Sequence, residues 1–371
     1  MKSNLIYILT LMLVISCTSN RSVQEIDNSL IEHASLLKMQ KFDDGIVLCR
    51  IANPWNTGET TAQYLLVPTE HKLFNEKSEK EFADRYGASK VIRTPLERVT
   101  LTSSCHGYLL DQIDASGTIS VFCDAEYVTY TAIKDLIAQG KIANGGNSMA
   151  PNAETILSHN SDAIWISPFE NAANGNIGNL PIHTIYCADY METSPLGRAE
   201  WMKFYGCLVG KGTEADSLFT LVEEKYKSIK ESSSLGNNRP SLFADLPYQS
   251  TWYVAGGCST MGIMYNDAGY EYIWADDNHS GSLALSEEIV LSKAHDADIW
   301  LFKYYADHEY TKEEFLAMNP YYAQFKAVQE GNVFGCNTMF TDYYDVTPFR
   351  PDILLSELQS LDKGTYFHII K

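Results

Sequence analysis

Past its first 17 residues the chain has no apolar run near the ~20 residues that a membrane-spanning helix needs. This absence excludes a protein that crosses the membrane many times. Basic residues are also scarce, since 28 Lys and Arg stand against 47 Asp and Glu and leave a net charge of −19. Because phosphate binding needs a positive field, nucleic acid is excluded as a general partner.

Catalytic signatures are missing as well. The sequence has no HExxH, no GxSxG and no set of Cys and His residues at zinc-binding spacing. The glycine-rich GGCST at 256–260 is neither a GxGxxG fingerprint nor a P-loop, and we interpret it as a turn into a helix. These absences favour a binding protein over an enzyme, with no metal or cofactor of its own.

The eight cysteines include no CxxC pair. Cys17 lies near the N-terminus, and the other seven are an odd number, which excludes a complete disulfide framework. They occur in apolar or strand-like stretches, so we expect small buried hydrophobic side chains. A disulfide such as Cys105 with Cys123 is the alternative in an oxidising compartment.

The chain contains enough apolar material for large cores. Of its 371 residues, 45% are hydrophobic and 12% are aromatic, which excludes disorder as the bulk state. At ~100–200 residues per domain, this length predicts two domains.

Residues 1–17 have the pattern of a secretory signal, with Lys2 followed by an apolar stretch. They end in VISC, which resembles the lipobox of bacterial lipoproteins. The resemblance implies lipid attachment at Cys17 and a polar tether over 18–37, and an ordinary signal with a chance cysteine is the alternative. No acidic run follows Cys17. In lipoproteins of the Bacteroides type, such a run resembles a signal for export to the cell surface. Its absence here favours an anchor that faces the periplasm, in the inner or outer membrane.

Residues 38–195 combine a hairpin with an α/β pattern. Two β-like runs flank the turn-rich NPWNTG between 41 and 68, which predicts the hairpin. Further along, near-continuous apolar strands alternate with helical stretches such as TAIKDLIAQG. This alternation predicts a parallel sheet covered on both faces. The expected strands are 99–104, 118–123, 163–169 and 183–189.

Residues 196–236 interrupt this alternation and predict a helical linker. Apolar residues keep helical spacing from Ala215 to Ile229, and Thr213 with Asp216 resembles a capping box. About 22 residues at 1.5 Å each make a helix of ~33 Å, long enough to run along two lobes.

Residues 237–371 form a second alternating series, with expected strands at 241–247, 270–275, 297–305 and 332–338. An internal repeat supports two similar lobes, because residues 154–163 match 288–297 and each copy leads into an Ile-Trp strand. Chance similarity is the alternative. The predicted fold is α/β, with two Rossmann-like lobes joined by a single long backbone helix.

This combination resembles the helical-backbone (class III) substrate-binding proteins of bacterial ABC importers. The likeness extends over about residues 38–371, and VTLTSSCHGYLLDQI, PNAETILSHNSDAIWIS and WYVAGGCSTMGIMYNDAGY carry much of it. It is greatest for a Bacteroides-type lipoprotein branch of iron-siderophore and cobalamin binders. The resemblance implies a monomer in the periplasm, anchored to a membrane by lipid, whose partners are an ABC permease dimer and its ATPase. Since 213–234 contain no proline or glycine, we expect ligand binding to move the lobes by only a few degrees.

The class docks onto its permease through one glutamate on each lobe. The matching positions are Glu154 and Glu288, which the internal repeat places at equivalent sites. Two carboxylates on a rigid body suit a partner with paired cations. The alternative is two solvated glutamates, which are also favourable near helix N-termini.

Ligands of open α/β sheets bind outside the carboxyl ends of the strands. This rule places an aromatic set with a few charges at the ligand site, which suits a large planar or catecholate-like ligand better than a bare ion. Each residue also has a structural alternative: His106 caps a helix, for example, or Arg198 pairs with Glu192 or Glu200. The expected ligand-binding residues are His106, Tyr127, Glu192, Arg198, Trp252, Tyr253, Lys303 and Asn337.

The expected ligand is a ferric complex, a siderophore or a haem-like molecule, because the cations and tyrosines offer partners to an anionic chelate. Cobalamin is the alternative within the same class. Two less favoured hypotheses are a surface adhesin or sensor that has no role in transport, and a receptor for Zn or Mn. The receptor would need convergent ligands among His106, His183, His279 and His308.

Overall fold

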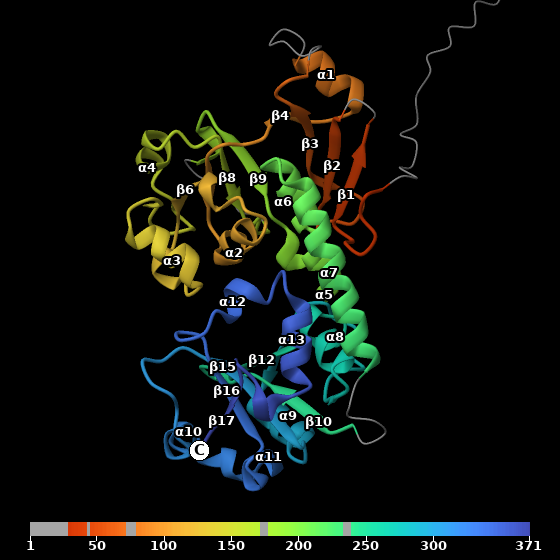
Figure 1. Cartoon of the computed structure of the whole chain (residues 1–371). Coiled ribbons are helices and arrows are strands. Elements are labelled where there is room, and N and C mark those ends of the chain that lie inside the picture. Colours follow the sequence, from red (N-terminus) through yellow and green to blue (C-terminus); the bar gives the residue numbers. More distant parts are fainter. Residues whose placement is uncertain (1–28, 43–44, 72–78, 171–176, 233–238) are drawn as a thin grey trace, which may run out of the picture.

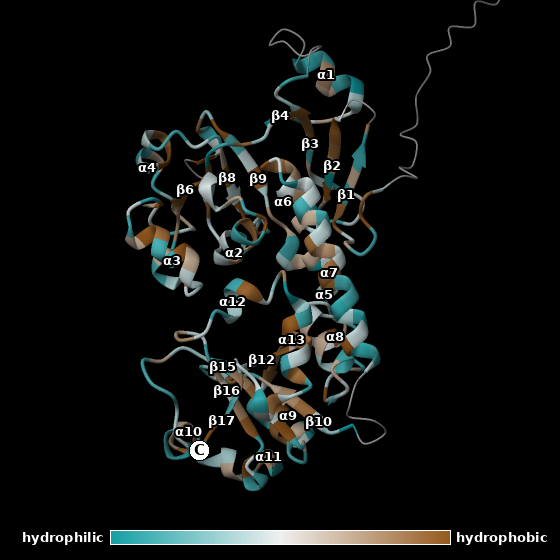
Figure 2. Ribbon diagram, in the orientation of Figure 1, coloured by the Kyte–Doolittle hydropathy of each residue, from teal (hydrophilic) through white to brown (hydrophobic). Residues whose placement is uncertain are grey.

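The computed structural model describes residues 29–42, 45–71, 79–170, 177–232 and 239–371, and the statements below concern these residues. The expected signal peptide 1–17, its Cys17 and most of the expected tether lie outside them. Figure 1 shows two α/β lobes with helix α7 (Gly212–Glu231) running along one side of both. The strands at the centre of each lobe carry the hydrophobic colours of Figure 2.

The N-terminal lobe is built around a parallel sheet in the order β7-β6-β5-β8-β9. The four strands predicted from the sequence begin within one residue of their expected positions. Val99, Ile164 and Trp165 are fully buried, so both faces of the sheet are covered. The strands are β5 Val99–Leu101, β6 Ile119–Phe122, β7 Ala143–Asn144, β8 Ala163–Ile166 and β9 His183–Tyr186; the helices are α2 Ser104–Gln112, α3 Thr131–Ala138 and α4 Ala153–Ser158.

A second sheet, in the order β1-β2-β3-β4, packs against this lobe (Figure 1). Its β2 and β3 are the expected hairpin, and the sequence did not predict the two outer strands. The hydroxyl of Tyr64 donates to Thr184 O and accepts from Tyr186 N, both at 3.0 Å, and so covers the edge of β9. The elements are β1 Leu37–Lys41, β2 Val47–Ala52, β3 Thr60–Pro68, α1 Glu79–Tyr86 and β4 Lys90–Thr94.

The tether expected at 18–37 ends earlier than predicted, because residues 29–36 belong to the folded body. The carboxylate of Glu200, which is fully buried, accepts the backbone N–H groups of residues 32, 33 and 34 at 2.7–2.9 Å. Glu192 accepts those of residues 35 and 36 at 2.8 and 2.9 Å. A polar stretch is therefore fixed by buried carboxylates that are distant in sequence, which local patterning does not reveal.

The C-terminal lobe repeats the architecture, with a sheet in the order β13-β10-β15-β16-β17 that is parallel except for β17. All four expected strands are confirmed. A small antiparallel sheet, β11-β12-β14, is added to it. The strands are β10 Ser241–Ala244, β11 Pro247–Tyr248, β12 Thr251–Ala255, β13 Glu271–Tyr272, β14 Ser282–Ser286, β15 Ile299–Tyr304, β16 Val333–Asn337 and β17 His368–Ile369; the helices are α8 Thr260–Asp267, α9 Glu287–Ala294, α10 Lys312–Met318, α11 Lys326–Glu330, α12 Tyr343–Val346 and α13 Pro351–Leu358.

The linker contains three helices, α5 (Pro195–Glu200), α6 (Met202–Leu208) and α7, of which only α7 runs along both lobes. Its 20 residues span ~30 Å at 1.5 Å each, close to the expected length. The expected capping box at Thr213 does not form, because the N-cap lies two residues earlier, at Lys211, whose side chain makes no cap hydrogen bond.

Helix α7 contributes to two hydrophobic cores. Ala215, Phe219 and Val222 pack into the core of the N-terminal lobe, and Tyr226 packs into that of the C-terminal lobe. The Tyr226 hydroxyl also donates to Asp267 Oδ2 at 2.8 Å. The predicted arrangement, two α/β lobes joined by one long helix, is confirmed.

Replacing Glu200 by alanine should lower the free energy of unfolding by about 3–5 kcal/mol, because buried N–H groups would lose their acceptor. Urea denaturation followed by tryptophan fluorescence measures the change. The control is Glu224→Ala at an exposed position of α7, which should cost less than about 0.5 kcal/mol. Equal losses in the two variants would show that Glu200 does not hold residues 29–36 in place.

Candidate functional site

The carboxyl ends of the two parallel sheets meet at the boundary between the lobes, and we call the residues that follow these strand ends the interlobe face. Asp345, in α12, reaches across it from the C-terminal lobe. Its Oδ2 accepts the backbone N–H groups of Thr129 and Tyr130 at 2.9 and 2.7 Å and the Thr129 hydroxyl at 2.5 Å. The two lobes are therefore in direct contact at the place where such sheets bind ligands.

Aromatic rings join and surround the interlobe face. Phe349 lies in the N-terminal core with its ring centroid 5.9 Å from those of His106 and Tyr205. Tyr127, after β6, and Tyr305, after β15, approach to 6.2 Å across the lobes and are 59% and 56% exposed. Five further exposed rings lie in or beside the chain that follows the strand ends: Phe169, Tyr248, Tyr253, Phe340 and Tyr344.

Two cations lie near these strand ends, one on the linker helix α5 and one in the C-terminal lobe. Arg198, on α5, donates from Nε to Asp189 Oδ2 at 3.3 Å, and its side chain is 25% exposed. Lys303, near the end of β15, contacts Asp245 Oδ1 through Nζ at 2.6 Å and is 20% exposed. The structure thus pairs Arg198 with Asp189, rather than with Glu192 or Glu200 as the sequence also allowed.

The environment shifts the pKa of one member of each pair, Asp189 and Lys303. Burial alone raises the pKa of Asp189, but the hydrogen bond from His106, the positive charge of Arg198 and the hydrogen bond from Tyr205 hold it below its usual value. Burial lowers the pKa of Lys303, but the neighbouring Asp245 carboxylate and several tyrosines raise it well above its usual value. The raised pKa keeps Lys303 protonated at neutral pH, and both cations keep a solvent-accessible side.

Four other residues expected at the ligand site are at most 3% exposed, and their ligand role stays a prediction: His106, Glu192, Trp252 and Asn337. Each hydrogen-bonds other buried polar groups, as buried polar side chains in folded proteins generally do. His106 Nε2 bonds Asp189 at 3.2 Å, Glu192 accepts from Trp201 Nε1 at 2.9 Å, Trp252 Nε1 donates to Ala244 O at 3.2 Å, and Asn337 Nδ2 donates to Ala306 O at 3.0 Å and to His308 O at 3.1 Å.

The cysteines from Cys49 to Cys336 are all free, so the alternative Cys105–Cys123 disulfide is not formed. Burial raises the pKa of both thiols to about 12, which leaves them protonated and inert. Cys105 lies with His106 and Asp189 in one buried group. Because Arg198 already binds Asp189 and the thiol is protonated, this donor set is a poor match for a divalent cation.

The four histidines that a Zn or Mn receptor would need as ligands do not lie together in the described residues. His106 is buried at the interlobe face, and His183 begins β9 at the opposite end of its sheet. His279 and His308 are exposed in the other lobe, where each bonds a neighbouring aspartate.

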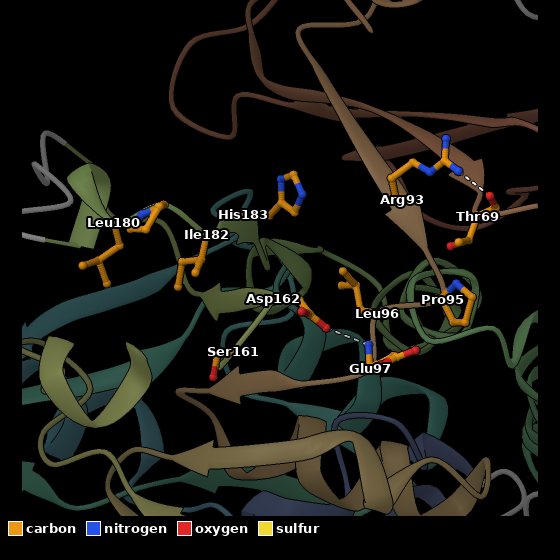
Figure 3. Close-up of a pocket in the computed structure, with 11 residues that line it drawn as sticks. Thr69, Arg93, Pro95, Leu96, Glu97, Ser161, Asp162, Leu180, Ile182 and His183 are labelled. Atoms are coloured by element: carbon orange, nitrogen blue, oxygen red, sulfur yellow. Dashed lines mark hydrogen bonds between the residues drawn. The ribbon is translucent and has the colours of Figure 1, made fainter. Parts of the chain in front are cut away.

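A pocket of about 550 Å³ lies at the amino ends of β8 and β9, away from the interlobe face (Figure 3). Beside it, Asp162 accepts the backbone N–H groups of Glu97 and Arg98, each at 2.8 Å, and Arg93 donates to Thr69 O. These contacts fasten the chain that passes from one sheet to the other, so we assign them a structural role.

Glu154 and Glu288 occupy equivalent positions, as the internal repeat predicts. Each is the exposed second residue of a helix, α4 or α9, whose preceding residue, Asn152 or Ser286, caps the helix through its side chain. A hydrogen bond from Ser286 lowers the pKa of Glu288. Both carboxylates are available to a partner, and their docking role stays a prediction.

Comparisons with known proteins agree with this architecture. Residues 128–338 match the model of the periplasmic binding protein family, so the chain belongs to that family. The family comprises substrate-binding proteins of transport systems and is not a class of enzymes. No helix in the described ranges is both long and apolar enough to cross a membrane.

Individual relatives are distant in sequence. An uncharacterized lipoprotein of Methanocaldococcus jannaschii is 27% identical over 93% of this chain and 84% of its own. A periplasmic heme binding protein of Pseudomonas aeruginosa matches 74% of this chain and 98% of its own, with a TM-score of 0.58 and 13% identity. An ABC-type Fe3+-hydroxamate transport protein of Saccharomonospora viridis matches 73% and 94%, with a TM-score of 0.56 and 14% identity.

Sequence reasoning missed Asp345, Phe349 and Asp245 at the interlobe face. Asp345 and Phe349 lie in TDYYDVTPF, eight and twelve residues past the end of β16, where no periodic pattern marks them. Asp245 directly follows β10, so the strand-end rule that selected the other residues also applies to it.

We predict that ligand binding moves the lobes by only a few degrees, because α7 lies in both cores and Asp345 and Phe349 join the lobes. X-ray scattering profiles with and without ligand should nearly superimpose. Asp345→Ala, which removes three interlobe hydrogen bonds, is the comparison, and its ligand-free radius of gyration should exceed that of the unchanged protein. A clear fall in radius of gyration on ligand binding by the unchanged protein would contradict the prediction.

Proposed function

We propose that this protein is the substrate-binding lipoprotein of an ABC importer, and that it captures an anionic ferric complex, a siderophore or a haem-like molecule, between its lobes. The observation that carries the proposal is the pair of part-exposed cations, Arg198 on the linker helix α5 and Lys303 in the C-terminal lobe. A chelate with acidic oxygens would replace water at both cations, and charge-assisted hydrogen bonds are about twice as strong as neutral ones.

The exposed rings support a large, flat or aromatic ligand. Tyr127 and Tyr305 stand at the boundary of the lobes, and Tyr344 lies near Lys303, whose pKa it helps to raise. Aromatic faces of this kind bury much area at little entropic cost. Cobalamin is the alternative ligand, because the same rings suit a planar macrocycle that does not need the two cations.

Delivery to a permease dimer with its ATPase is the second part of the proposal. It is supported by the equivalent exposed positions of Glu154 and Glu288, one on each lobe. Lipid attachment at Cys17 would hold a monomer on the periplasmic side of a membrane, in line with the lipoprotein relative.

Alanine at Arg198 or Lys303 should weaken binding of an anionic ferric chelate by about tenfold or more, because one charge-assisted contact is lost. Titration with a ferric siderophore, haemin and cobalamin, followed by absorbance and by melting temperature, measures affinity and folding together. Lys326→Ala is the matched control. Lys326 also forms an ion pair with an aspartate, Asp298, but this pair lies at the amino end of β15, away from the interlobe face. Tight binding of cobalamin with the same affinity in both alanine variants and in the unchanged protein would favour cobalamin as the ligand.

The double variant Glu154→Ala with Glu288→Ala should keep the ligand affinity of the unchanged protein and abolish uptake by cells. Isotope uptake in cells and binding by the purified protein are the two measurements. Glu224→Ala with Glu313→Ala, two exposed glutamates elsewhere, is the control for lost charge. Normal uptake in cells that carry the Glu154 and Glu288 variant would refute the docking role.

A further inference from the structure

A pocket of about 370 Å³ lies between the N-terminal sheet and the lobe sheet, at the carboxyl end of β8. One wall is the turn between β2 and β3, with Trp55 and Asn56. The other is the chain after β8, with Ser167 and Phe169, together with Tyr186 of β9. The turn precedes residue 128, where the match to the family model begins.

The turn wall is held in place before any ligand arrives. Asn53 Oδ1 accepts the backbone N–H groups of Trp55 and Asn56 at 2.9 and 3.1 Å. Glu59 accepts the side-chain amides of both asparagines at 3.3 and 3.2 Å. On the facing wall, Tyr190 donates its hydroxyl to Pro168 O, and its ring lies 6.2 Å from that of Phe169. A preorganised pocket loses little entropy when it binds.

The chemistry of the lining selects the class of ligand. Three rings, those of Trp55, Phe169 and Tyr186, are combined with amide and hydroxyl groups, and the lining contains no Lys, Arg or His. Its one carboxylate, on Glu170, disfavours an anion. Aromatic faces with neutral hydrogen-bonding groups match a sugar ring, which has an apolar C–H face and a rim of hydroxyls. The volume lies within the ~300–1,000 Å³ usual for small-molecule sites.

We propose that this pocket binds a neutral polyhydroxylated group, a saccharide, stacked on Trp55. The saccharide has two possible sources: a free sugar, or a sugar carried by a ligand bound at the interlobe face. The proposal goes beyond capture of a ferric chelate, because the pocket has no cation for one and its main ring comes from the N-terminal hairpin.

The test uses the full-length chain in detergent, with neutral mono- and disaccharides followed by saturation-transfer NMR and tryptophan fluorescence. We expect saturable binding that Trp55→Ala weakens by about tenfold and that Trp55→Phe largely retains. Phe169→Ala, at an exposed position, should also weaken it and covers the case in which the Trp55 variant fails to fold. Tyr321→Ala, an exposed ring of the other lobe, is the control and should change nothing.

A second arm compares a glycosylated ferric chelate with its sugar-free form. Tighter binding of the glycosylated form that is lost in Trp55→Ala, without binding of free sugars, would identify the ligand-borne source. The proposal is overturned if no neutral saccharide binds in either arm, or if binding is unchanged in both Trp55→Ala and Phe169→Ala. The sugar-free chelate should still bind to the Trp55→Ala variant. Failure of the saccharide proposal can therefore be told apart from failure of the proposed function, which the Arg198 and Lys303 variants test.

Discussion

Helix α7 is buried in two hydrophobic cores at once, and the positions of the interlobe residues depend on it. Phe219 and Val222 are part of the N-terminal core, whereas Tyr226, one turn further on, is part of the C-terminal core. The hydrogen bonds within a helix fix the distance between its two halves, so the lobes cannot separate widely unless the helix breaks or one core opens. The interlobe face is therefore kept near one spacing, and its rings and cations are held in place before a ligand binds.

Buried carboxylates hold several loops of the two lobes in place. Glu200 and Glu192 accept the N–H groups of residues 32–36, Asp345 accepts those of 129 and 130 from the other lobe, and Glu357 accepts those of 365–367 at 2.7–2.9 Å. In each case an acceptor from one segment satisfies donors of a loop that has no strand or helix partner. An acidic chain thus uses part of its charge internally, where removal of an acceptor would leave several donors unpaired.

This division explains which features the sequence could reveal. Strands such as β8 and β15, and helix α7, follow from apolar runs and periodicity, which are local properties. The ends of the tether and the burial of His106 and Glu192 depend on partners up to 168 residues away, for which a single sequence carries no signal. Arg198, Lys303, Tyr127 and Tyr253 were predicted as ligand residues from their places after strand ends, and the structure leaves all four at least partly exposed.

The overall charge and the local charge act in opposite directions at the interlobe face. A net charge of −19 gives a negative field that slows the approach of an anion, but salt screens this field beyond ~8–10 Å. Within that distance, Arg198 and Lys303 are each neutralised by one aspartate, so an anionic ligand gains from them only through direct contact. Recognition of such a ligand must therefore rest on short-range geometry, and the α7 arrangement is what holds that geometry constant.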